Sequence, residues 1–288
     1  MPAVTIVIPA YNPGPLLNRA LRSVVEQTTQ DWECVVVDDG GEEALDWLDT
    51  YHPQVRRFRQ ANGGVSIARN QALLLASSPL VAYLDQDDEW VPEKLECQLA
   101  RLGDADLSYT AFVWVRSDGS EQLNEAPAID YMQFLREGHI CLSSLLVRRT
   151  ALGCVGGFNQ LLRVQQDYDL MLRLLAVGAR SAPLEQVLTR CYLHAGNVSR
   201  DYQRALWERL HILELHEMEA ARRSDAAALR AAREGKDVAR RLYAAQAFTM
   251  FRKERTPMHL GRAFMWSPAE TSAELVRAAR RHKIRIGD

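Results

Sequence analysis

The chain has 288 residues, 47% of them hydrophobic, which is enough for one large domain with a helical region appended. Its five cysteines are widely spaced and include no CxxC pair, which argues against a disulfide-rich scaffold and against a zinc site. The net charge of -2 combines an acidic front with a basic end, since residues 200–288 contain 19 Lys and Arg against 12 Asp and Glu. An acidic front without a known binding motif argues against nucleic acid as a partner.

No leader segment or membrane span is expected. The sequence runs directly into VTIVIPAYN, and no stretch comes near the roughly eighteen apolar residues that a membrane span needs. We therefore expect a protein that is neither secreted nor membrane-spanning. The cysteine pattern agrees with a reducing, cytoplasmic location.

Short apolar runs alternate with helical patterns through the first third of the chain. Strands are predicted at 4–8, 34–37, 55–58 and 80–84, and helices at 15–27 and 66–76. This alternation is typical of βαβ units in a mostly parallel sheet. The predicted strands end in the polar loops PAYNPG, DDGG, ANGG and DQDDEW. Because ligands bind at the carboxyl ends of the strands in such sheets, these loops predict a shared site.

The rest of the sequence predicts further strands and a helical end. A helix follows Pro92, apolar strands are expected at 107–115 and 141–149, and a helix at 167–177 ends before Gly178. A Ser-Asp-Gly turn at 117–119 closes the first of these strands. Residues 200–288 have an almost wholly helical pattern. We therefore predict an α/β domain at 1–199 and a basic helical region at 200–288.

An acidic cluster, Asp85-Gln86-Asp87-Asp88, follows the buried strand VAYL. Three carboxylates within four residues repel one another unless a cation lies among them. Mg²⁺ and Mn²⁺ are suited to sites with one or two carboxylates and the phosphates of a nucleotide. The cluster therefore indicates a divalent metal site. The alternative is a solvated acidic loop that caps the next helix.

Two further motifs indicate contacts to a nucleotide. Asp38 and Asp39 follow the strand CVVV, where a carboxylate can accept hydrogen bonds from a base or a ribose, although Asp and Gly are also ordinary turn formers. In NGGVSIARN the glycines would let a ligand approach the backbone. Arg69, in the first turn of the helix that follows, could contact a base carbonyl or a phosphate.

Seven motifs in this order resemble the family 2 glycosyltransferases, which have the A-type, Rossmann-like nucleotide-sugar fold. They are PAYN, VVVDDG, NGGVSIARN, YLDQDD, GGFN, QDYDLMLR and YLHAGNVS, and they span about two thirds of the chain. The resemblance implies a donor site lined by Pro9, Ala10, Tyr11, Asn12, Asp39, Asn62, Gly63, Arg69, Asp85, Gln86 and Asp87. It also implies that Asp87 and His194 hold a divalent metal, Mn²⁺ or Mg²⁺. Outside this context a lone histidine would be read as a surface or packed residue.

The resemblance places the general base at Asp167, at the start of a helix that faces the acceptor. The alternative is a plain helix N-cap, because Asp is favoured there. Asp169 and Arg173 match the family pattern as supporting residues. Two positions depart from it, since Gln166 stands where Glu is frequent and Gly41 where Ser is frequent. Gln166 can form hydrogen bonds but cannot carry a charge.

The resemblance implies an inverting transfer of a sugar from a UDP- or dTDP-sugar to an acceptor hydroxyl, in cell-surface polysaccharide or glycolipid synthesis. The rival interpretation is an inactive nucleotide-binding module of the same fold. A dinucleotide oxidoreductase is disfavoured because no GxGxxG follows the first strand. A sugar-phosphate nucleotidyltransferase is disfavoured because the loop PAYNPGPLLNRA has a single glycine.

The basic helical region has two interpretations. Trp207, Phe248, Phe251, Phe264 and Trp266 are interleaved with arginines, as in helices that lie on an anionic membrane surface, where a lipid-linked acceptor would be found. The alternative, which the sequence favours, is packing onto the catalytic domain or a contact in a homodimer.

Overall fold

The computed structural model describes residues 1–194, 201–254 and 256–285. The chain divides into two compact units, of which the first comprises Met1–Tyr131 and Gly138–Val198. The second comprises Met132–Glu137 and Ser199–Asp288. The division lies close to the predicted boundary between residues 199 and 200. It differs in that the short internal segment Met132–Glu137 belongs to the second unit.

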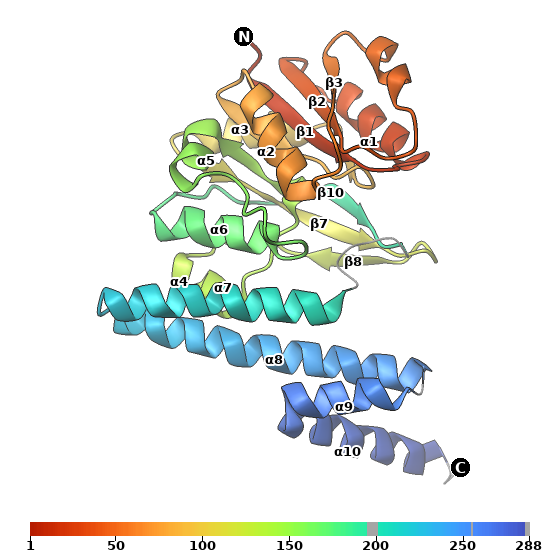
Figure 1. Cartoon of the computed structure of the whole chain (residues 1–288), viewed down its shortest axis with the longest axis vertical. Coiled ribbons are helices and arrows are strands. Elements are labelled where there is room, and N and C mark those ends of the chain that lie inside the picture. The colour runs from red at the N-terminus through yellow and green to blue at the C-terminus, as the bar shows by residue number, and fades with distance from the viewer. Residues whose placement is uncertain (195–200, 255, 286–288) are drawn as a thin grey trace. The chain divides into compact units, whose positions relative to one another are not determined.

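A six-stranded sheet forms the centre of the first unit (Figure 1). Its strands are β1 (Val4–Ala10), β2 (Trp32–Asp38), β3 (Val55–Arg59), β4 (Leu80–Tyr83), β6 (Leu107–Ser108) and β9 (Leu146–Arg148). The spatial order is β3-β2-β1-β4-β9-β6, and β3, β2, β1 and β4 are parallel. The strand β9 runs antiparallel to β4 and β6. The prediction of a mostly parallel sheet is confirmed, so the loops after β1, β2 and β4 leave the same edge.

Burial on both faces explains the apolar strand sequences. Every residue of β1 is buried, as expected for a parallel strand that is covered on both sides. On one side lies α1 (Leu16–Val25), whose core residues recur at helical spacing: Leu17, Ala20, Leu21 and Val24. Burying a leucine side chain contributes about 1.5–3 kcal/mol relative to leaving it exposed.

Further helices belong to this unit (Figure 1). They are η1 (Asp46–Thr50), α2 (Val65–Leu75), α3 (Lys94–Leu102), η2 (Leu142–Ser144), α5 (Arg149–Val155) and α6 (Gln166–Ala176). The helices α2, α3 and α6 agree with the predicted ones, whereas α5 was not predicted.

A second sheet of four strands also belongs to the first unit. It consists, in spatial order, of β5 (Glu89–Trp90), β10 (Leu184–Tyr192), β7 (Thr110–Val115) and β8 (Glu121–Asn124). The strand β10 was not predicted, although it leads directly to His194. The apolar run at 107–115 forms two strands, β6 and β7, rather than one, because the chain leaves the first sheet at Tyr109 and enters the second. The strand predicted at 141–149 is wrong for most of its length, because residues 142–144 form η2.

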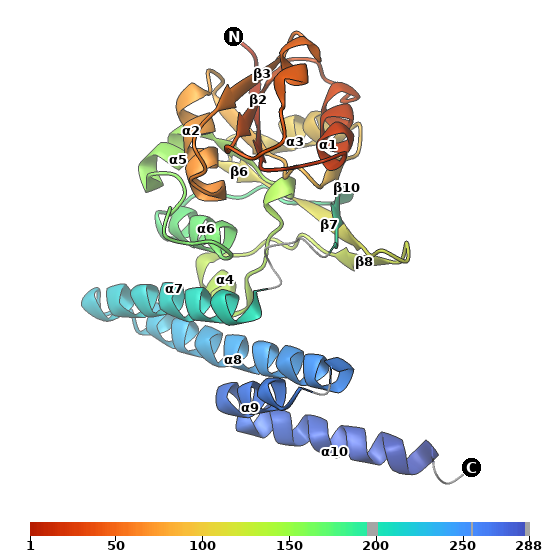
Figure 2. The same cartoon turned by 45° about the vertical axis from the view of Figure 1, so that its right-hand side comes forward.

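The second unit is helical, as predicted. It consists of α4 (Tyr131–Glu137), α7 (Tyr202–Arg222), α8 (Ala226–Glu254), α9 (Pro257–Trp266) and α10 (Pro268–Arg285). The helices α7 and α8 run side by side (Figure 1, Figure 2), and Glu217 joins them through ion pairs with Arg233 at 2.7 Å and Lys236 at 2.5 Å. A Cβ at Gly235 would lie 2.1 Å from the carbonyl oxygen of Leu135, so glycine lets α8 approach α4 closely. Among the residues described, no helix is long and apolar enough to cross a membrane.

A fully buried lysine lies at the start of α3. Lys94 is 0% exposed, its Nζ donates a hydrogen bond to Oε1 of Gln98 at 2.7 Å, and it lies 3.9 Å from the centre of the Trp90 ring. Burial lowers the pKa of Lys94 from 10.5 to about 7. Each tenfold change in proton affinity corresponds to about 1.4 kcal/mol. Protonated Lys94 therefore opposes folding by an amount on the order of a few kcal/mol.

Replacing Lys94 with methionine is expected to raise the free energy of unfolding near pH 6. In the wild type, the free-energy cost of burying charged Lys94 is fully present below pH 7, where Lys94 is protonated in both the folded and the unfolded state. It is relieved as the pH rises from about 7 to 10.5, because the folded protein then binds fewer protons than the unfolded chain. The lost hydrogen bond to Gln98 offsets about 1 kcal/mol of the gain.

Urea unfolding at pH 6 and pH 9 measures this effect. The advantage of Lys94→Met should shrink at the higher pH, whereas Lys236→Met, which removes an ion-paired lysine, should bring no gain. A destabilised Lys94→Met variant at pH 6 would contradict the prediction.

Candidate active site

Three of the predicted motifs meet at the carboxyl edge of the parallel strands. Pro9 and Ala10 are buried at the end of β1, and the carbonyl of Ala10 accepts a hydrogen bond from the backbone NH of Asp39 at 2.8 Å. The backbone NH of Tyr11 donates to Oε1 of Gln86 at 2.8 Å. These bonds join the loops after β1, β2 and β4, while the Tyr11 side chain itself is half exposed.

Asp39 is buried and holds the glycine loop that the sequence predicted nearby. Its Oδ1 accepts hydrogen bonds from the backbone NH of Gly63 at 2.9 Å and from Nε2 of Gln60 at 2.7 Å. Its Oδ2 accepts from the backbone NH of Gly64 at 2.8 Å. A carboxylate has about four acceptor positions, so Asp39 retains capacity for one more donor. The adjacent Asn62 is exposed.

The departure from the family pattern at Gly41 has a steric explanation. Asn12 has a φ of 44°, in the left-handed region that asparagine tolerates, and its Oδ1 accepts hydrogen bonds from the backbone NH groups of Glu42 at 2.8 Å and Glu43 at 3.2 Å. A Cβ at Gly41 would lie 2.3 Å from that oxygen. A serine here would displace Asn12, so the two residues depend on each other.

Arg69 and Asp85 form an ion pair at the end of β4. Nη2 of Arg69 lies 2.5 Å from Oδ1 of Asp85, and the guanidinium lies 5.3 Å from the centre of the Phe158 ring. The Arg69 side chain is 6% exposed. Its Nε and the hydroxyl of Tyr83 are buried without a hydrogen-bond partner in the described part of the chain. An unpaired buried donor costs about 1–3 kcal/mol, so a ligand oxygen that reached it would be bound favourably.

The two residues predicted to hold a metal are in contact. Nε2 of His194, just beyond β10, lies 2.7 Å from Oδ2 of Asp87. Burial, and secondarily the charge of Asp85, raises the pKa of Asp87. A carboxylate is a suitable ligand for Mn²⁺ or Mg²⁺, and imidazole nitrogens bind divalent transition metals, so the pair fits Mn²⁺ better than Mg²⁺. The rest of the YLHAGNVS motif lies outside the described residues.

Asp88 is buried behind the acidic loop and fixes its position. The hydroxyl of Ser143 donates to Oδ2 of Asp88 at 2.6 Å and accepts from the backbone NH of Asp85 at 3.0 Å. The backbone NH of Tyr192 donates to Oδ1 of Asp88 at 3.2 Å, two residues before His194. Burial, followed by the neighbouring carboxylates, raises the pKa of Asp88 well above its usual value. Sequence reasoning missed Ser143, because no local pattern links it to the acidic loop.

Two cysteines that are distant in sequence also lie at Asp88. All five cysteines are free, but the Sγ atoms of Cys141 and Cys191 are 2.8 Å apart. Together with Asp88 they could form a buried three-ligand group. Thiols select soft cations rather than Mn²⁺ or Mg²⁺. The pKa of Cys191 is raised by burial, and that of Cys141 is also raised, so both thiols stay protonated. This group is therefore not the predicted metal site.

Asp167 lies in the first turn of α6, where it is half-buried. The alternative that Asp167 is the N-cap is wrong, because Gln165 occupies that position. Asp169 and Arg173 form an ion pair at 2.6 Å, and Nη1 of Arg173 donates to the carbonyl of Val155 at 2.6 Å. These bonds attach α6 to the end of α5 and support the turn that carries Asp167.

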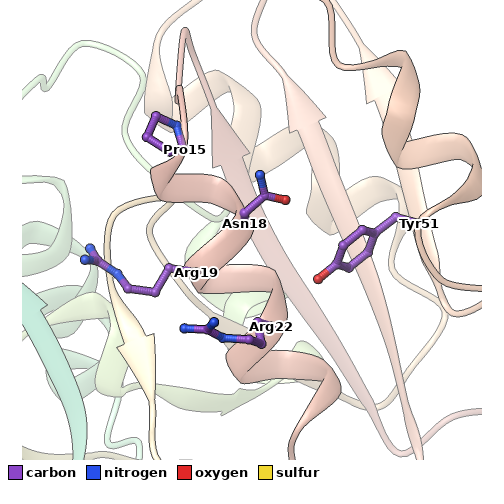
Figure 3. Close-up of a pocket in the computed structure, with 5 residues that line it drawn as sticks. All are labelled: Pro15, Asn18, Arg19, Arg22 and Tyr51. Carbon is purple, nitrogen blue, oxygen red and sulfur yellow. The ribbon is translucent and has the colours of Figure 1, made fainter.

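A hollow of about 410 Å³ opens on the outer side of α1. Figure 3 shows four lining residues along α1, with Tyr51 facing them; they are Pro15, Asn18, Arg19 and Arg22. None of the predicted donor or metal residues lines it. Arg19 connects it to the site, because its guanidinium donates to the carbonyl of Asp87 and lies 3.5 Å from the centre of the Tyr192 ring. The sequence had not indicated this role for Arg19.

Comparison with known proteins identifies the family. The model of glycosyl transferase family 2 matches residues 5–161, more than half of the chain. This chain belongs to glycosyl transferase family 2. The Bacillus subtilis protein named "Putative teichuronic acid biosynthesis glycosyltransferase TuaG" is 28% identical to this transferase over 231 residues, 74% of this chain and 91% of the relative. Chondroitin synthase of Pasteurella multocida is 31% identical over 210 residues, which cover 69% of this chain but 21% of the synthase.

Solved structures support the same fold for this family 2 transferase. S. aureus TarS 1-349 in complex with UDP superimposes with a TM-score of 0.67 at 18% identity, over 94% of this chain and 82% of TarS 1-349. The complex of the same fragment with UDP-GlcNAc gives a TM-score of 0.61 at 19% identity, over 73% of this chain and 66% of that one. The predicted A-type glycosyltransferase fold is confirmed.

Proposed function

We propose that this transferase moves a sugar from a nucleoside diphosphate sugar to an acceptor hydroxyl, with inversion at the anomeric carbon. The arrangement at the end of β4 is the main support for this proposal. There Asp85 pairs with Arg69 at 2.5 Å and Asp87 pairs with His194 at 2.7 Å. Segments far apart in sequence thus bring cationic, anionic and metal-binding groups to the place where a diphosphate leaving group would lie.

The base and ribose of the donor would bind on the β1 and β2 side of the site. Asp39 already orders the loop that contains Gly63 and retains one acceptor position for a base NH or a ribose hydroxyl. Gln86 holds the backbone at Tyr11 close to this loop. The unpaired Nε of Arg69 would donate to a carbonyl or phosphate oxygen of the donor.

Asp87 and His194 would hold Mn²⁺ or Mg²⁺, and the diphosphate and water would complete the coordination. Such an ion, when bound, stabilises the charge that develops on the leaving diphosphate. The chain's own contribution is to hold both ligands in place. It does so through Asp88, whose carboxylate binds Ser143 at one end of the acidic loop and Tyr192 beside His194.

Asp167 would act as the general base. The acceptor oxygen forms a bond to the anomeric carbon, the bond from that carbon to the diphosphate oxygen breaks, and the acceptor proton passes to the Asp167 carboxylate. The position of Asp167 in the first turn of α6 supports this role, because the helix N-terminus favours the ionised carboxylate.

The relatives support a donor and acceptor class. One TarS structure is a complex with UDP and another a complex with UDP-GlcNAc, and the B. subtilis and P. multocida relatives are named for polysaccharide synthesis. We therefore propose a uridine or thymidine diphosphate sugar as donor. The proposed acceptor is a growing polysaccharide or a glycolipid.

A thermal-shift screen with nucleotides tests the donor site. UDP or dTDP with Mn²⁺ is expected to raise the melting temperature, because a ligand at about 100 times its Kd adds roughly 2.7 kcal/mol of stability. Slow, Mn²⁺-dependent release of the diphosphate from the matching nucleotide sugar should follow. Stabilisation without any release or transfer would favour the inactive binding module. No stabilisation by any nucleoside diphosphate would overturn the proposed site.

A further inference from the structure

The helix α9 has an inner side that is already covered within the second unit. Ala263 is fully buried with Phe248 of α8, and further apolar residues pack around this pair: Phe251, Leu260, Trp266 and Leu275. This small core joins α8, α9 and α10. The apolar residues of the outer side are therefore not needed to hold α9 in place.

The outer side of α9 and of the first turns of α10 is exposed and uncharged. The exposed residues between 257 and 273 are Pro257, Met258, Gly261, Phe264, Met265, Pro268, Ala269, Ser272 and Ala273. The side chains of Met258 and Met265 are 53% and 68% exposed. The two charged residues of this segment, Arg262 and Glu270, are half-buried. A helix that is apolar on both sides is normally covered by something else.

The basic residues that follow this apolar surface in the sequence indicate what kind of partner covers it. Residues 277–285 include five Arg and Lys, and the sequence has no acidic residue from 275 to 287. The nearest acids, Glu270 and Glu274, both pair with Arg277 at 2.6 and 3.0 Å. Elsewhere in the unit several described arginines pair with acids, as Arg222 and Arg223 do with Glu219. The sequence at the end of α10 therefore carries an excess of positive charge directly after the segment that forms the apolar surface.

We infer that the α9–α10 hairpin docks on an anionic bilayer surface, with the outer side of α9 at the level of the lipid headgroups. Apolar side chains that enter the boundary between headgroups and acyl chains are removed from water, which favours binding. Lys and Arg side chains near an anionic surface are attracted to it and add to this binding. A second copy of this chain is a poorer partner, because the basic ends of two hairpins would repel each other.

This docking is independent of catalysis. If the proposed function holds, docking has one consequence for catalysis. It brings the enzyme close to acceptors that are carried by membrane lipids. A bilayer-bound transferase samples such acceptors in two dimensions, at a raised effective concentration. Soluble acceptors would not share this advantage.

Vesicle co-sedimentation of the full chain tests the inference. Wild-type protein should bind vesicles of phosphatidylcholine with phosphatidylglycerol, bind phosphatidylcholine alone far less, and dissociate as salt is raised. Met265→Glu should weaken binding about tenfold or more, since burying a methionine is worth about 1.5–3 kcal/mol. Met218→Glu on α7 is the matched control, because Met218 is 64% exposed and lies outside the hairpin. Its binding should match the wild type.

Both variants should keep Mn²⁺-dependent release of diphosphate from a nucleotide sugar, which separates a docking failure from a failure of the proposed function. Absence of binding to the anionic vesicles would overturn the inference. Equal binding by the two variants would overturn it as well. So would a stable wild-type dimer in sedimentation velocity that Met265→Glu dissociates, because the second copy would then be the occupant.

Discussion

Replacing Asp167 with asparagine is expected to lower the rate of sugar transfer by about 10²–10⁴-fold, the usual contribution of a general base. Asparagine keeps the shape of the side chain but cannot accept the acceptor proton. The affinity for UDP with Mn²⁺ should stay close to that of the wild type, because Asp167 lies on α6 whereas the proposed donor residues lie at the edge of the parallel strands. Steady-state transfer assays and UDP titration by calorimetry measure the two quantities.

Asp169→Asn is the matched control on the same helix. Asp169 is buried and ion-paired with Arg173, so its replacement should lower stability by about 1–3 kcal/mol and should lower transfer by the folded protein far less than Asp167→Asn does. Asp167→Asn should instead leave the melting temperature almost unchanged. Full transfer activity of Asp167→Asn would remove Asp167 from the mechanism. Loss of UDP affinity would mean that Asp167 acts on the donor side.

Replacing Asp87 with asparagine is expected to remove both metal binding and transfer. A metal ion acting as a Lewis acid is worth several kcal/mol in the transition state, so transfer should fall at least about 10²-fold at 1.4 kcal/mol for each tenfold change. The extra stabilisation that Mn²⁺ gives to the UDP complex should disappear. Undiminished stabilisation of Asp87→Asn by Mn²⁺ with UDP would show that Asp87 does not hold the ion.

In the absence of metal, Asp87→Asn should not lower the thermal stability of the protein. Burial and the nearby charge of Asp85 raise the pKa of Asp87, so the folded protein holds this proton more tightly than the unfolded chain does. Its contribution to stability therefore falls as the pH rises from the ordinary aspartate pKa to the raised value. Asp87→Asn avoids that loss and should melt at the same or a higher temperature at neutral pH. A melting temperature lowered by several degrees would assign Asp87 a structural role.

Asp118→Asn serves as the control for charge alone. Asp118 lies in the exposed turn between β7 and β8, where it accepts hydrogen bonds from Ser120. The substitution removes one negative charge away from the site. Transfer, UDP affinity and the response to Mn²⁺ should all remain at wild-type values.

The local pattern of the sequence was sufficient for the parallel half of the fold. Apolar runs such as 4–8 and 34–37, separated by a helical period, became β1 and β2 because both faces of these strands are covered. The order of polar loops then placed Asp39 and Gln86 at the same sheet edge. The composition of residues 200–288 likewise determined a helical end.

The sequence could not determine pairings that depend on distant segments. The run at 107–115 has one apolar pattern but serves two sheets, and β10 alternates too weakly to be recognised before it pairs with β7. The contact of Asp87 with His194 spans 107 residues, and it forms because β10 ends beside the acidic loop. Motif resemblance alone had indicated that pair.

Some features were decided by tertiary structure alone. Ser143 joins Asp85 to Asp88, and Gly41 makes room for Asn12, yet serine and glycine are ordinary residues that carry no signal of such roles. The sequence by itself determined the parallel strands, the helices between them, the helical end and which loops bear charge, because these follow from periodicity over a few residues. Which charged groups meet was decided by tertiary structure, because burial and hydrogen bonding act between atoms that only folding brings together.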